Sequence, residues 1–519
     1  AQVAASLGLP DEKVEVRLGG VGGAFGARED VSLQVHLCLL ALRCGRPVKM
    51  VYGREESFLG HVHRHPARLW YRHHAARDGT LVKVEAKLLL DGGAYCSSSP
   101  AVLANAACFA PGPYRVPNAV VEGWAVRTNN PPCGAMRGFG AVQACFGHEA
   151  QMDRLAGALG LDPVELRLRN ALRPGDRLVT GQRVEGAAPV AELIRACAAA
   201  PLPPPVSSAT DPLALPGGPG RTTTPADVRR GVGLAVGFKN LLFSEGYDDP
   251  ATATVELDGG VATVTTACAE VGQGFVTLVH QIVHEVLGDV DVVVAPASTT
   301  AVASAGSTSA SRQTWMSGGA VKLAAEEVRR RVDAGETGPV GATVEHRHRP
   351  TGPLGRDGQG EPHVSFTFAC HRAVVDVDGE LGLVRLADLT TSQEVGRVLN
   401  PLQLLGQLEG GAAQGAGLAL MEELVVDGGV LRNPSFTDYL VPTALDLPAL
   451  RVAALLEQPE EHLGAPFGAK GAGEAPAISS GAAVVAAVRD ATGLPLARVP
   501  VHPQDIALDG GDRPGAVDR

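Results

Sequence analysis

Five glycine-rich segments constrain this chain more than any other feature of its sequence. Each carries a polar or aromatic side chain, and four of the five run into an apolar stretch with helical period. Glycine lets backbone amides approach a ligand closely, and the start of a helix presents unpaired N–H groups with a partial positive charge. We therefore expect the segments to converge on a large, flat, oxygen-rich anion. They are Gly22–Gly26 with the nearby Glu29, Arg137–Gly140, Glu270–Gly274, Gly406–Gly411 and Gly468–Glu474.

The last segment supplies the carboxylate that we expect to do proton chemistry. Lys470 is the only bulky residue in the loop before Glu474, so this carboxylate can lie desolvated beside a ligand. A plainer role, as a cap for the following helix, is equally open. Taken singly, each glycine segment is also consistent with a tight turn or a helix cap, and Phe139 with an ordinary core position.

Length and composition predict a mixed α and β (α+β) globular protein. A chain of 519 residues is too long for one core. We expect two halves, residues 1–200 and 228–510, joined by a linker at 201–227 that is rich in Pro, Gly, Ser and Thr. The net charge of −11 argues against nucleic acid as a partner.

The cysteines and the apolar runs bear on location and redox chemistry. Nine cysteines are scattered without a C-x-x-C pair, which indicates a reducing compartment and no iron–sulfur cluster held by this chain alone. No apolar run is long enough to span a membrane, and no signal peptide opens the chain, so we expect a cytoplasmic protein without a membrane partner. The chain opens at Ala1 with a helical pattern already under way, and we expect an N-terminal part of a longer protein to be absent.

Periodicity and capping signals predict the main elements. Asp162 is an explicit N-cap, with Pro163 in the first helical position and Glu165 completing a capping box. Ala334–Pro362 is expected to be a surface loop. Strands are expected at Val14–Leu18, Leu81–Leu90, Thr254–Leu257, Val261–Thr266, Val364–Val377 and Leu383–Leu389, and helices at Asp30–Arg43, Gln143–Leu159, Phe275–Val286 and after Gln407 and Ser480.

Several common functional motifs are missing. Phe25 stands where a dinucleotide fingerprint needs its last glycine. The chain has no P-loop, no H-E-x-x-H and no G-x-S-x-G. A histidine-rich stretch has arginines among its members that would repel a metal cation, so we expect a surface or structural role for it. Its histidines are His61, His63, His65, His73 and His74.

Seven stretches, taken together, resemble one known family, the molybdenum-binding large subunits of xanthine dehydrogenases and aldehyde oxidases, and most closely its bacterial xanthine dehydrogenase D-type members. The resemblance implies a two-part molybdopterin-binding architecture from which the N-terminal region of the family is missing. The stretches are Gly19–Glu29, Asn129–Met152, Leu161–Leu172, Glu270–Gly274, Gly306–Thr314, Gly406–Gly417 and Gly468–Pro476.

The resemblance also implies roles for individual residues. Glu474 matches the general base of the family. Glu29 and Phe139 resemble its substrate-orienting carboxylate and its stacking ring, and Asn105 stands where animal relatives carry a substrate-binding arginine. Molybdenum is held through the pterin with no direct protein ligand. The residues that resemble cofactor contacts are Phe25, Gly26, Arg137, Gln273, Gly274, Ser309, Ala310, Ser311 and Gln407.

The activity that the resemblance implies is oxidative hydroxylation of a purine, xanthine or hypoxanthine, with water as the oxygen source. Electrons then pass to partner subunits that carry [2Fe–2S] and FAD. The alternatives are an aldehyde or another N-heterocycle as substrate, a cofactor-binding assembly subunit without turnover, and an inactive fragment. Whether the molybdopterin carries a cytosine dinucleotide is left open.

Overall fold

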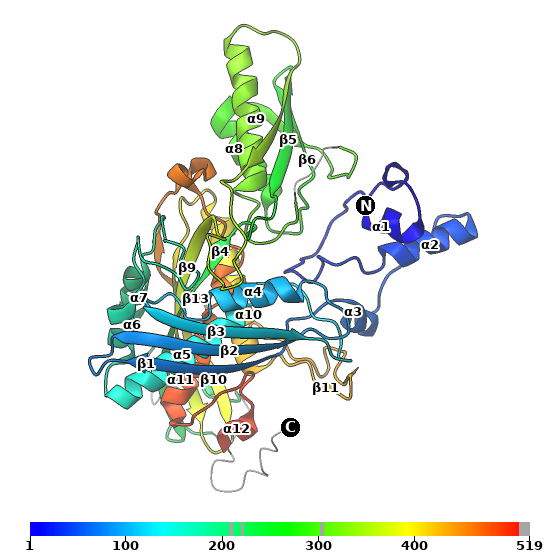
Figure 1. Ribbon diagram of the computed structural model, residues 1–519. Helices are drawn as coiled ribbons and strands as arrows, with labels where there is room; N and C mark the ends of the chain where they lie inside the picture. Colours follow the sequence, from blue (N-terminus) through cyan, green and yellow to red (C-terminus); the bar gives the residue numbers. More distant parts are fainter. Residues whose placement is uncertain (207–210, 219–222, 302–305, 508–519) are drawn as a thin grey trace.

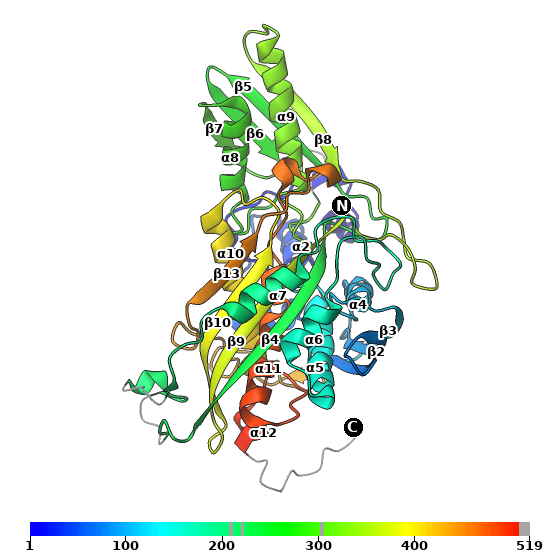
Figure 2. The same ribbon diagram turned by 90° about the vertical axis from the view of Figure 1, so that its left-hand side faces the viewer.

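The computed structural model describes residues 1–206, 211–218, 223–301 and 306–507. It consists of a body built on two sheets, a lobe that projects from one end of the body, and an N-terminal segment that extends to one side (Figures 1 and 2). That segment contains α1 (Gln2–Leu7), α2 (Gln34–Cys44) and α3 (Arg54–Gly60).

The first sheet of the body has the strand order β1-β2-β3. β1 (Ala67–Ala75) pairs antiparallel with β2 (Leu81–Asp91), and β3 (Asn118–Val126) pairs parallel with β2. Every second residue of β1 is more deeply buried, because successive side chains of a strand point to opposite faces. α4 (Ser99–Cys108) connects β2 to β3 and α5 (Ala141–Leu159) packs on β1, which brings the α4–α5 region over the sheet.

The second sheet has the order β13-β10-β9-β4 and forms the centre of the body. Every residue of β9 is buried, as expected for a strand covered on both faces. α11 (Ser480–Thr492) packs so closely on β4 that a Cβ at Gly231 would lie 2.1 Å from the carbonyl oxygen of Ala487. The strands are β4 (Val228–Leu241), β9 (Ser365–Asp378), β10 (Leu383–Glu394) and β13 (Leu450–Leu456), and α7 (Val190–Ala199) also packs on this sheet.

The lobe has its own sheet and its own core. Its strand order is β7-β6-β5-β8, and two helices pack with it (Figure 2). Val255, Ile282 and Trp315 are buried together in its core. The elements are β5 (Pro250–Asp258), β6 (Val261–Thr266), α8 (Phe275–Leu287), β7 (Asp291–Val294), α9 (Met316–Asp333) and β8 (Val340–Arg347).

The largest core draws on both halves of the sequence. It unites Cys145 and Leu193 with Phe368 and Val485. The boundary expected at 201–227 therefore separates two stretches that share this core, and the division into two domains stays a prediction. The remaining elements are α6 (Pro163–Asn170), α10 (Pro401–Leu420), β11 (Val426–Asp427), β12 (Val430–Leu431) and α12 (Pro503–Ala507).

The helix ends expected at Gly160 and Asp162 are confirmed, whereas Glu165 forms no capping box with Asp162. α5 ends at Gly160, which adopts the left-handed conformation with φ of 65°. The carboxylate of Asp162 accepts from the amides of Val164 (2.8 Å) and Glu165 (2.9 Å), as expected for an N-cap. Ser479 precedes α11, but its hydroxyl contacts Nδ1 of His371 at 2.8 Å instead of capping the helix.

Two expected elements are wrong. Val14–Leu18 forms no strand, because its pairing is limited to an isolated bridge between Arg17 and Ser298 at the exposed N-terminal segment. The expected loop 334–362 contains strand β8, which pairs with β5. Val340, Ala342 and Val344 alternate with residues that face solvent. This alternation is short and lies among glycines and charged residues, so it gave a weak strand signal. The helix expected from Asp30 begins only at Gln34.

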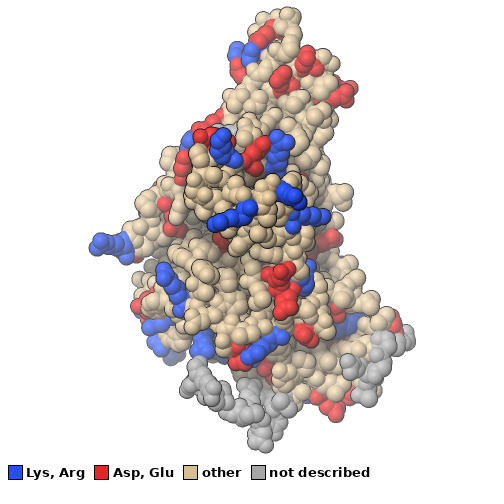
Figure 3. Space-filling model, turned by 90° about the vertical axis from the view of Figure 1, so that its right-hand side faces the viewer, with Lys and Arg blue, Asp and Glu red and all other residues tan. Residues whose placement is uncertain are grey.

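On one face of the molecule the surface charges are mixed, and the thiols of the chain are unpaired. Acidic and basic side chains are interspersed on the face shown in Figure 3. All nine cysteines lie among the described residues, and each is a free thiol. None of the helices that the described residues form has the length and apolarity needed to cross a membrane.

Candidate functional site

Three of the glycine-rich segments meet around Phe25. The amide of Gly23 donates to the carbonyl oxygen of Val271 (3.1 Å), and the amide of Arg137 donates to the carbonyl oxygen of Phe25 (2.8 Å). A Cβ at Gly26 would lie 2.6 Å from the carbonyl oxygen of Ala135, beside the Arg137 segment, so only glycine fits this approach. Residues far apart in the sequence are therefore in direct contact here.

Arg137 links these segments to the two that come later in the chain. Arg137 is 5% exposed, and its guanidinium donates through Nε to the carbonyl oxygen of Gly473. Nη2 donates to the carbonyl oxygen (2.9 Å) and Oε1 (3.2 Å) of Gln407, and Nη1 donates to Oε1 of Gln414 (3.3 Å). Burial lowers the pKa of Arg137 to about 10, so the side chain is a buried cation at neutral pH. All five segments thus lie together.

The Gly406–Gly411 segment is not a loop, which corrects the expectation. It lies inside α10, a helix of 20 residues. Gly411 serves close packing, because a Cβ there would lie 2.4 Å from Cβ of Pro476. Gly415, further along α10, does the same, because a Cβ there would lie 1.8 Å from Oγ of Ser480. Small residues at these positions let α10 approach the segment that follows Glu474.

A strained turn at Ala310 and Ser311 fixes the Glu474 loop. Both residues have positive φ (51° and 50°), which costs free energy for a residue with a side chain and is found mainly at functional sites. A Cβ at Gly471 would lie 1.8 Å from the carbonyl oxygen of Ser311. The amide of Glu474 donates to Oγ of Ser311 (3.1 Å). The turn and the loop therefore hold each other in place.

The Glu474 carboxylate is held at both oxygens. Oε1 accepts from the amide of Gly138 (3.1 Å), and Oε2 lies 2.9 Å from Nζ of Lys239 and 3.5 Å from Oγ of Ser311. The side chain is 14% exposed. A carboxylate oxygen has two lone pairs, so Oε1 can accept a further hydrogen bond or a proton.

Lys239 was missed by sequence reasoning. It lies on β4, is 2% exposed, and donates weakly to the carbonyl oxygen (3.3 Å) and Oδ1 (3.4 Å) of Asn240 besides pairing with Glu474. One signal could have found it: a lysine in a largely apolar run such as 234–242 is costly to bury without a partner.

Arg64 is a second cation that was given no role. Its Nη2 donates to the carbonyl oxygen of Arg137 (2.8 Å), and burial lowers its pKa to about 10. The histidines near it bind locally: Nε2 of His63 lies 2.6 Å from the carbonyl oxygen of Phe58, and Nε2 of His65 lies 2.8 Å from Oγ of Ser99. Within the described ranges, no three His, Cys, Asp or Glu side chains are grouped as metal ligands.

The three candidate substrate-binding residues are Glu29, Phe139 and Asn105. Glu29 lies at the rim of the site, where partial burial raises its pKa; a hydrogen bond from Ser309 opposes this and the charge of Glu474 adds to it. Phe139, with φ of 42°, follows the residue that binds Glu474. Asn105 is 5% exposed, and its Nδ2 donates to the carbonyl oxygen of Phe139 (2.6 Å). This amide therefore holds the Phe139 turn, and a role for Asn105 in substrate binding stays a prediction.

The side-chain amide of Gln273 is hydrogen-bonded within its own loop. Its Nε2 donates to the carbonyl oxygen of Ala269 (2.9 Å), and its Oε1 accepts from the amide of Val271 (2.7 Å). The first amides of α8 are bound by the carboxylate of Glu270, with Gly274 at 3.2 Å. This helix start therefore offers an anion fewer free N–H groups than we expected.

The residues present fit a large flat cofactor. A Cβ added at Gly22 or Gly272 would meet no atom within 4 Å, and one at Gly410 would meet only Nη1 of Arg137 at 3.8 Å. The backbone at these glycines therefore borders open space beside a buried cation. Phe25 adds a positive φ of 53° and a ring that is 53% exposed. Open backbone, a buried guanidinium and a partly exposed aromatic ring suit a pterin with anionic groups.

Comparisons with known proteins agree with this arrangement. Two sequence families, both described as a molybdopterin cofactor-binding domain, match residues 1–171 and residues 219–346 with 334–448. A probable D-type xanthine dehydrogenase subunit of Bacillus subtilis (strain 168) is 30% identical over 550 residues, which cover 99% of this chain and 71% of that protein. The nicotinate dehydrogenase large molybdopterin subunit of Eubacterium barkeri is 44% identical over 193 residues, 37% of this chain and 45% of that protein.

The same similarity is seen in three dimensions. The aldehyde oxidoreductase from Desulfovibrio gigas matches the structure with a TM-score of 0.85 at 27% identity, over 98% of this chain and 56% of that one. Matched over nearly its whole length, the chain spans 71% of the Bacillus protein and 56% of the Desulfovibrio protein. On the matched families, the Bacillus relative and the fold, the chain belongs to the molybdopterin-binding large subunits of the xanthine dehydrogenase and aldehyde oxidase family.

Proposed function

We propose that the chain is the catalytic part of a molybdenum hydroxylase that acts on a purine such as xanthine or hypoxanthine. The observation that carries the proposal is the Glu474 carboxylate, held by Gly138 and Lys239 where the glycine-rich segments meet. The loop that carries it is bound to Arg137 through the carbonyl of Gly473 and to the Ala310–Ser311 turn through its own amide.

In this proposal the chain holds the cofactor with residues from several elements. Arg137 supplies positive charge, the Ser309–Ser311 turn supplies backbone and hydroxyl groups, and Phe25 with Gly26 borders one side. Gln407 lies on α10 within reach of Arg137. Gln273 can take part only after leaving its bonds to Ala269 and Val271. The bound cofactor supplies the redox chemistry and an acidified water-derived oxygen.

The chain's own residues supply proton transfer and orientation. Oε1 of Glu474 takes a proton as general base. Lys239 and the amide of Gly138 keep the carboxylate in one position. The partly exposed ring of Phe139 offers a face on which a flat heterocycle can stack. The carboxyl of Glu29 can form a hydrogen bond at a purine edge.

Replacing the base tests this function. Glu474→Gln should lower kcat by about 10²–10⁴-fold, the usual contribution of a general base, while molybdenum content measured by mass spectrometry stays that of the parent. The matched control is Glu326→Gln, which changes a carboxylate on the surface of α9 that pairs with Lys322. A rate unchanged by Glu474→Gln would remove the proposed base. Molybdenum bound to a parent chain that never turns over would favour the assembly subunit.

The aldehyde alternative rests on the similarity to the Desulfovibrio gigas enzyme. Purines need hydrogen bonds at the ring edge and simple aldehydes do not. Glu29→Ala should therefore lower kcat/KM for xanthine by about 10- to 100-fold, the value of a hydrogen bond that involves a charged or acidic group, and leave an aromatic aldehyde almost unaffected. Turnover of aldehydes without any turnover of purines would overturn the purine assignment.

The partners are also part of the proposal. Electrons that arrive on the cofactor must leave, and the scattered free thiols of this chain do not form an iron–sulfur site. We therefore place [2Fe–2S] and FAD on separate subunits and the complex in the cytoplasm. Co-expression with candidate subunits should yield a complex that reduces an external acceptor, and the chain alone should not.

A further inference from the structure

We propose that Lys239 is a positioning residue for Glu474, which keeps this carboxylate ionised and fixes Oε2 so that Oε1 stays free to take a proton. The inference rests on the proposed function and deepens it. It starts from the 2.9 Å separation between Nζ of Lys239 and Oε2 of Glu474, in a pair whose side chains are 2% and 14% exposed.

The surroundings of the ammonium leave Glu474 as its main anionic partner. An ammonium has three donors, and those of Lys239 are directed to Glu474 and to two neutral oxygens of Asn240. His363 faces it from the segment before β9, where burial and the nearby Lys239 lower the pKa of the imidazole to about 3. A neutral imidazole offers the ammonium no counter-charge.

Other charged groups also act on Glu474, so Lys239 must be separated from them. Arg137 lies in the same site, where it binds the carbonyl oxygen of Gly473. Arg64 binds the backbone carbonyl of Arg137. Glu29 is the acidic neighbour, and its charge opposes that of Glu474. Both guanidiniums are bound mainly to backbone or amide oxygens, whereas Lys239 contacts the carboxylate directly. The direct contact should dominate, since Coulomb attraction falls with distance.

The first test needs no cofactor. Infrared difference spectra between the parent chain and Glu474→Gln report whether Glu474 is protonated, because a neutral carboxyl has a C=O stretch that a carboxylate lacks. As the pH is lowered, the band for Glu474 should appear at a higher pH in Lys239→Met than in the parent, whereas Lys239→Arg should behave like the parent. An identical spectrum for Lys239→Met and the parent would overturn the proposal.

A stability cycle covers the case in which Lys239→Met folds poorly. Each single variant leaves one buried charge without its partner, so Lys239→Met and Glu474→Gln should both lower the melting temperature. The double variant should melt above the value expected from adding the two effects. Strict additivity would mean that the two side chains are not coupled, and the proposal would fail. Lys83→Met, which removes a surface lysine that pairs with Glu85 (2.6 Å), is the control and should change little.

The pH–rate profile then links the pair to catalysis. Lys239→Met should move the acid limb of kcat/KM to higher pH by about 1–3 units, the usual effect of an adjacent opposite charge, and recover most of the parent rate above that limb. Lys239→Arg should keep the parent profile. A uniform loss at every pH would indicate a merely structural lysine. If instead Glu474→Gln were fully active, the proposed function would fail, whatever Lys239 does.

Discussion

The close packing of α10 against the Glu474 segment gives a prediction that needs neither cofactor nor substrate. Two glycines on the same helix differ in their surroundings. A Cβ at Gly406 would meet no atom within 4 Å, whereas one at Gly411 would lie 2.4 Å from Cβ of Pro476 and 2.9 Å from its carbonyl carbon. Pro476 is a buried ring two residues after Glu474, so it cannot rotate away as a flexible side chain would.

The magnitude follows from comparing the two alanine variants. Both gain about 0.5–1 kcal/mol, because alanine loses less conformational freedom than glycine in a helix. Only Gly411→Ala meets the steric conflict, which costs about 1–3 kcal/mol for one inserted carbon in a well-packed core. The gain cancels in the difference, so Gly411→Ala should be less stable than Gly406→Ala by about 1–3 kcal/mol.

Urea unfolding of the cofactor-free chain, followed by circular dichroism, measures this difference. The two variants should have the same denaturant dependence, so that a shift in midpoint reports stability. Gly406→Ala should unfold at a urea concentration equal to or above that of the parent, and Gly411→Ala below it. Equal midpoints for the two variants would refute the argument that α10 presses on the Glu474 segment.

Three further predictions follow from particular side chains. Asp162→Ala should cost about 1 kcal/mol by removing the cap of α6, which urea midpoints would show; no loss would mean that the amides of Val164 and Glu165 find water instead. Gly471→Ala should lower molybdenum content after reconstitution, because its Cβ would lie 1.8 Å from the carbonyl oxygen of Ser311, and normal content would contradict the account of that turn. Burial raises the pKa of Glu394 from 4.5 to about 7 in spite of its pairing with Lys470, so the folded chain keeps a proton that the unfolded chain loses. The stability from Glu394 is complete below pH 4.5 and is lost as the pH rises to about 7, with a slope of up to about 1.4 kcal/mol per pH unit. Glu394→Gln should remove this slope in urea midpoints measured across the window, and an unchanged slope would assign it to other groups.

Local signals in the sequence predicted helix ends better than they predicted contacts. Gly160 and Asp162 act within one helical turn, and both have the expected roles. Gly411 was misread because a glycine that serves a turn and one that serves close helix packing are identical in sequence. The partner that distinguishes them, Pro476, lies 65 residues away. The expected meeting of the segments rested on their glycines and on the helix starts that follow them.

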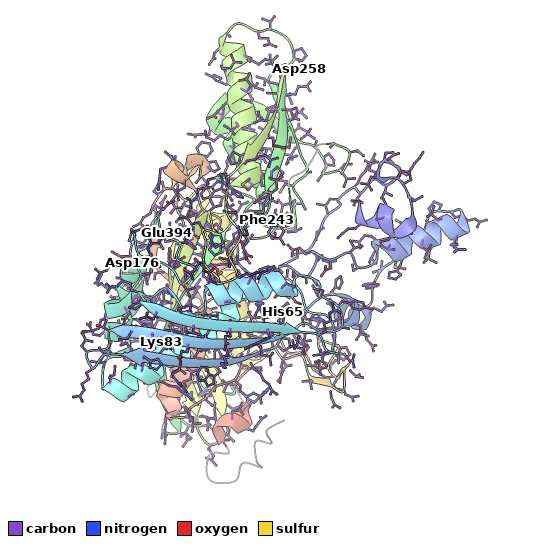
Figure 4. The ribbon with its side chains drawn as sticks, in the orientation of Figure 1. His65, Lys83, Asp176, Phe243, Asp258 and Glu394 are labelled. Carbon is purple, nitrogen blue, oxygen red and sulfur yellow. The ribbon has the colours of Figure 1, made fainter. Side chains whose placement is uncertain are left out.

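The parts of the site that could not be predicted are held by long-range contacts. Lys239 lies on β4, and its pairing with Glu474 depends on the way α11 packs on that strand. Asn105 donates to the carbonyl oxygen of Phe139, 34 residues further along the chain. In Figure 4, Glu394 and Phe243 lie between the lobe and the β1-β2-β3 sheet. Lys83 marks that sheet, and Asp258 marks the lobe, far from Glu394 and Phe243. Segments from the whole chain meet at the level of these two residues, and no local pattern encodes their register.

A structure determined with molybdopterin bound tests the central claim most directly. The account predicts that the pterin contacts Arg137 and the Ser309–Ser311 turn, and that the Glu474 carboxylate faces the molybdenum with Lys239 still paired to it. A cofactor seated elsewhere on the chain, or a Glu474 side chain directed away from the metal, would contradict it.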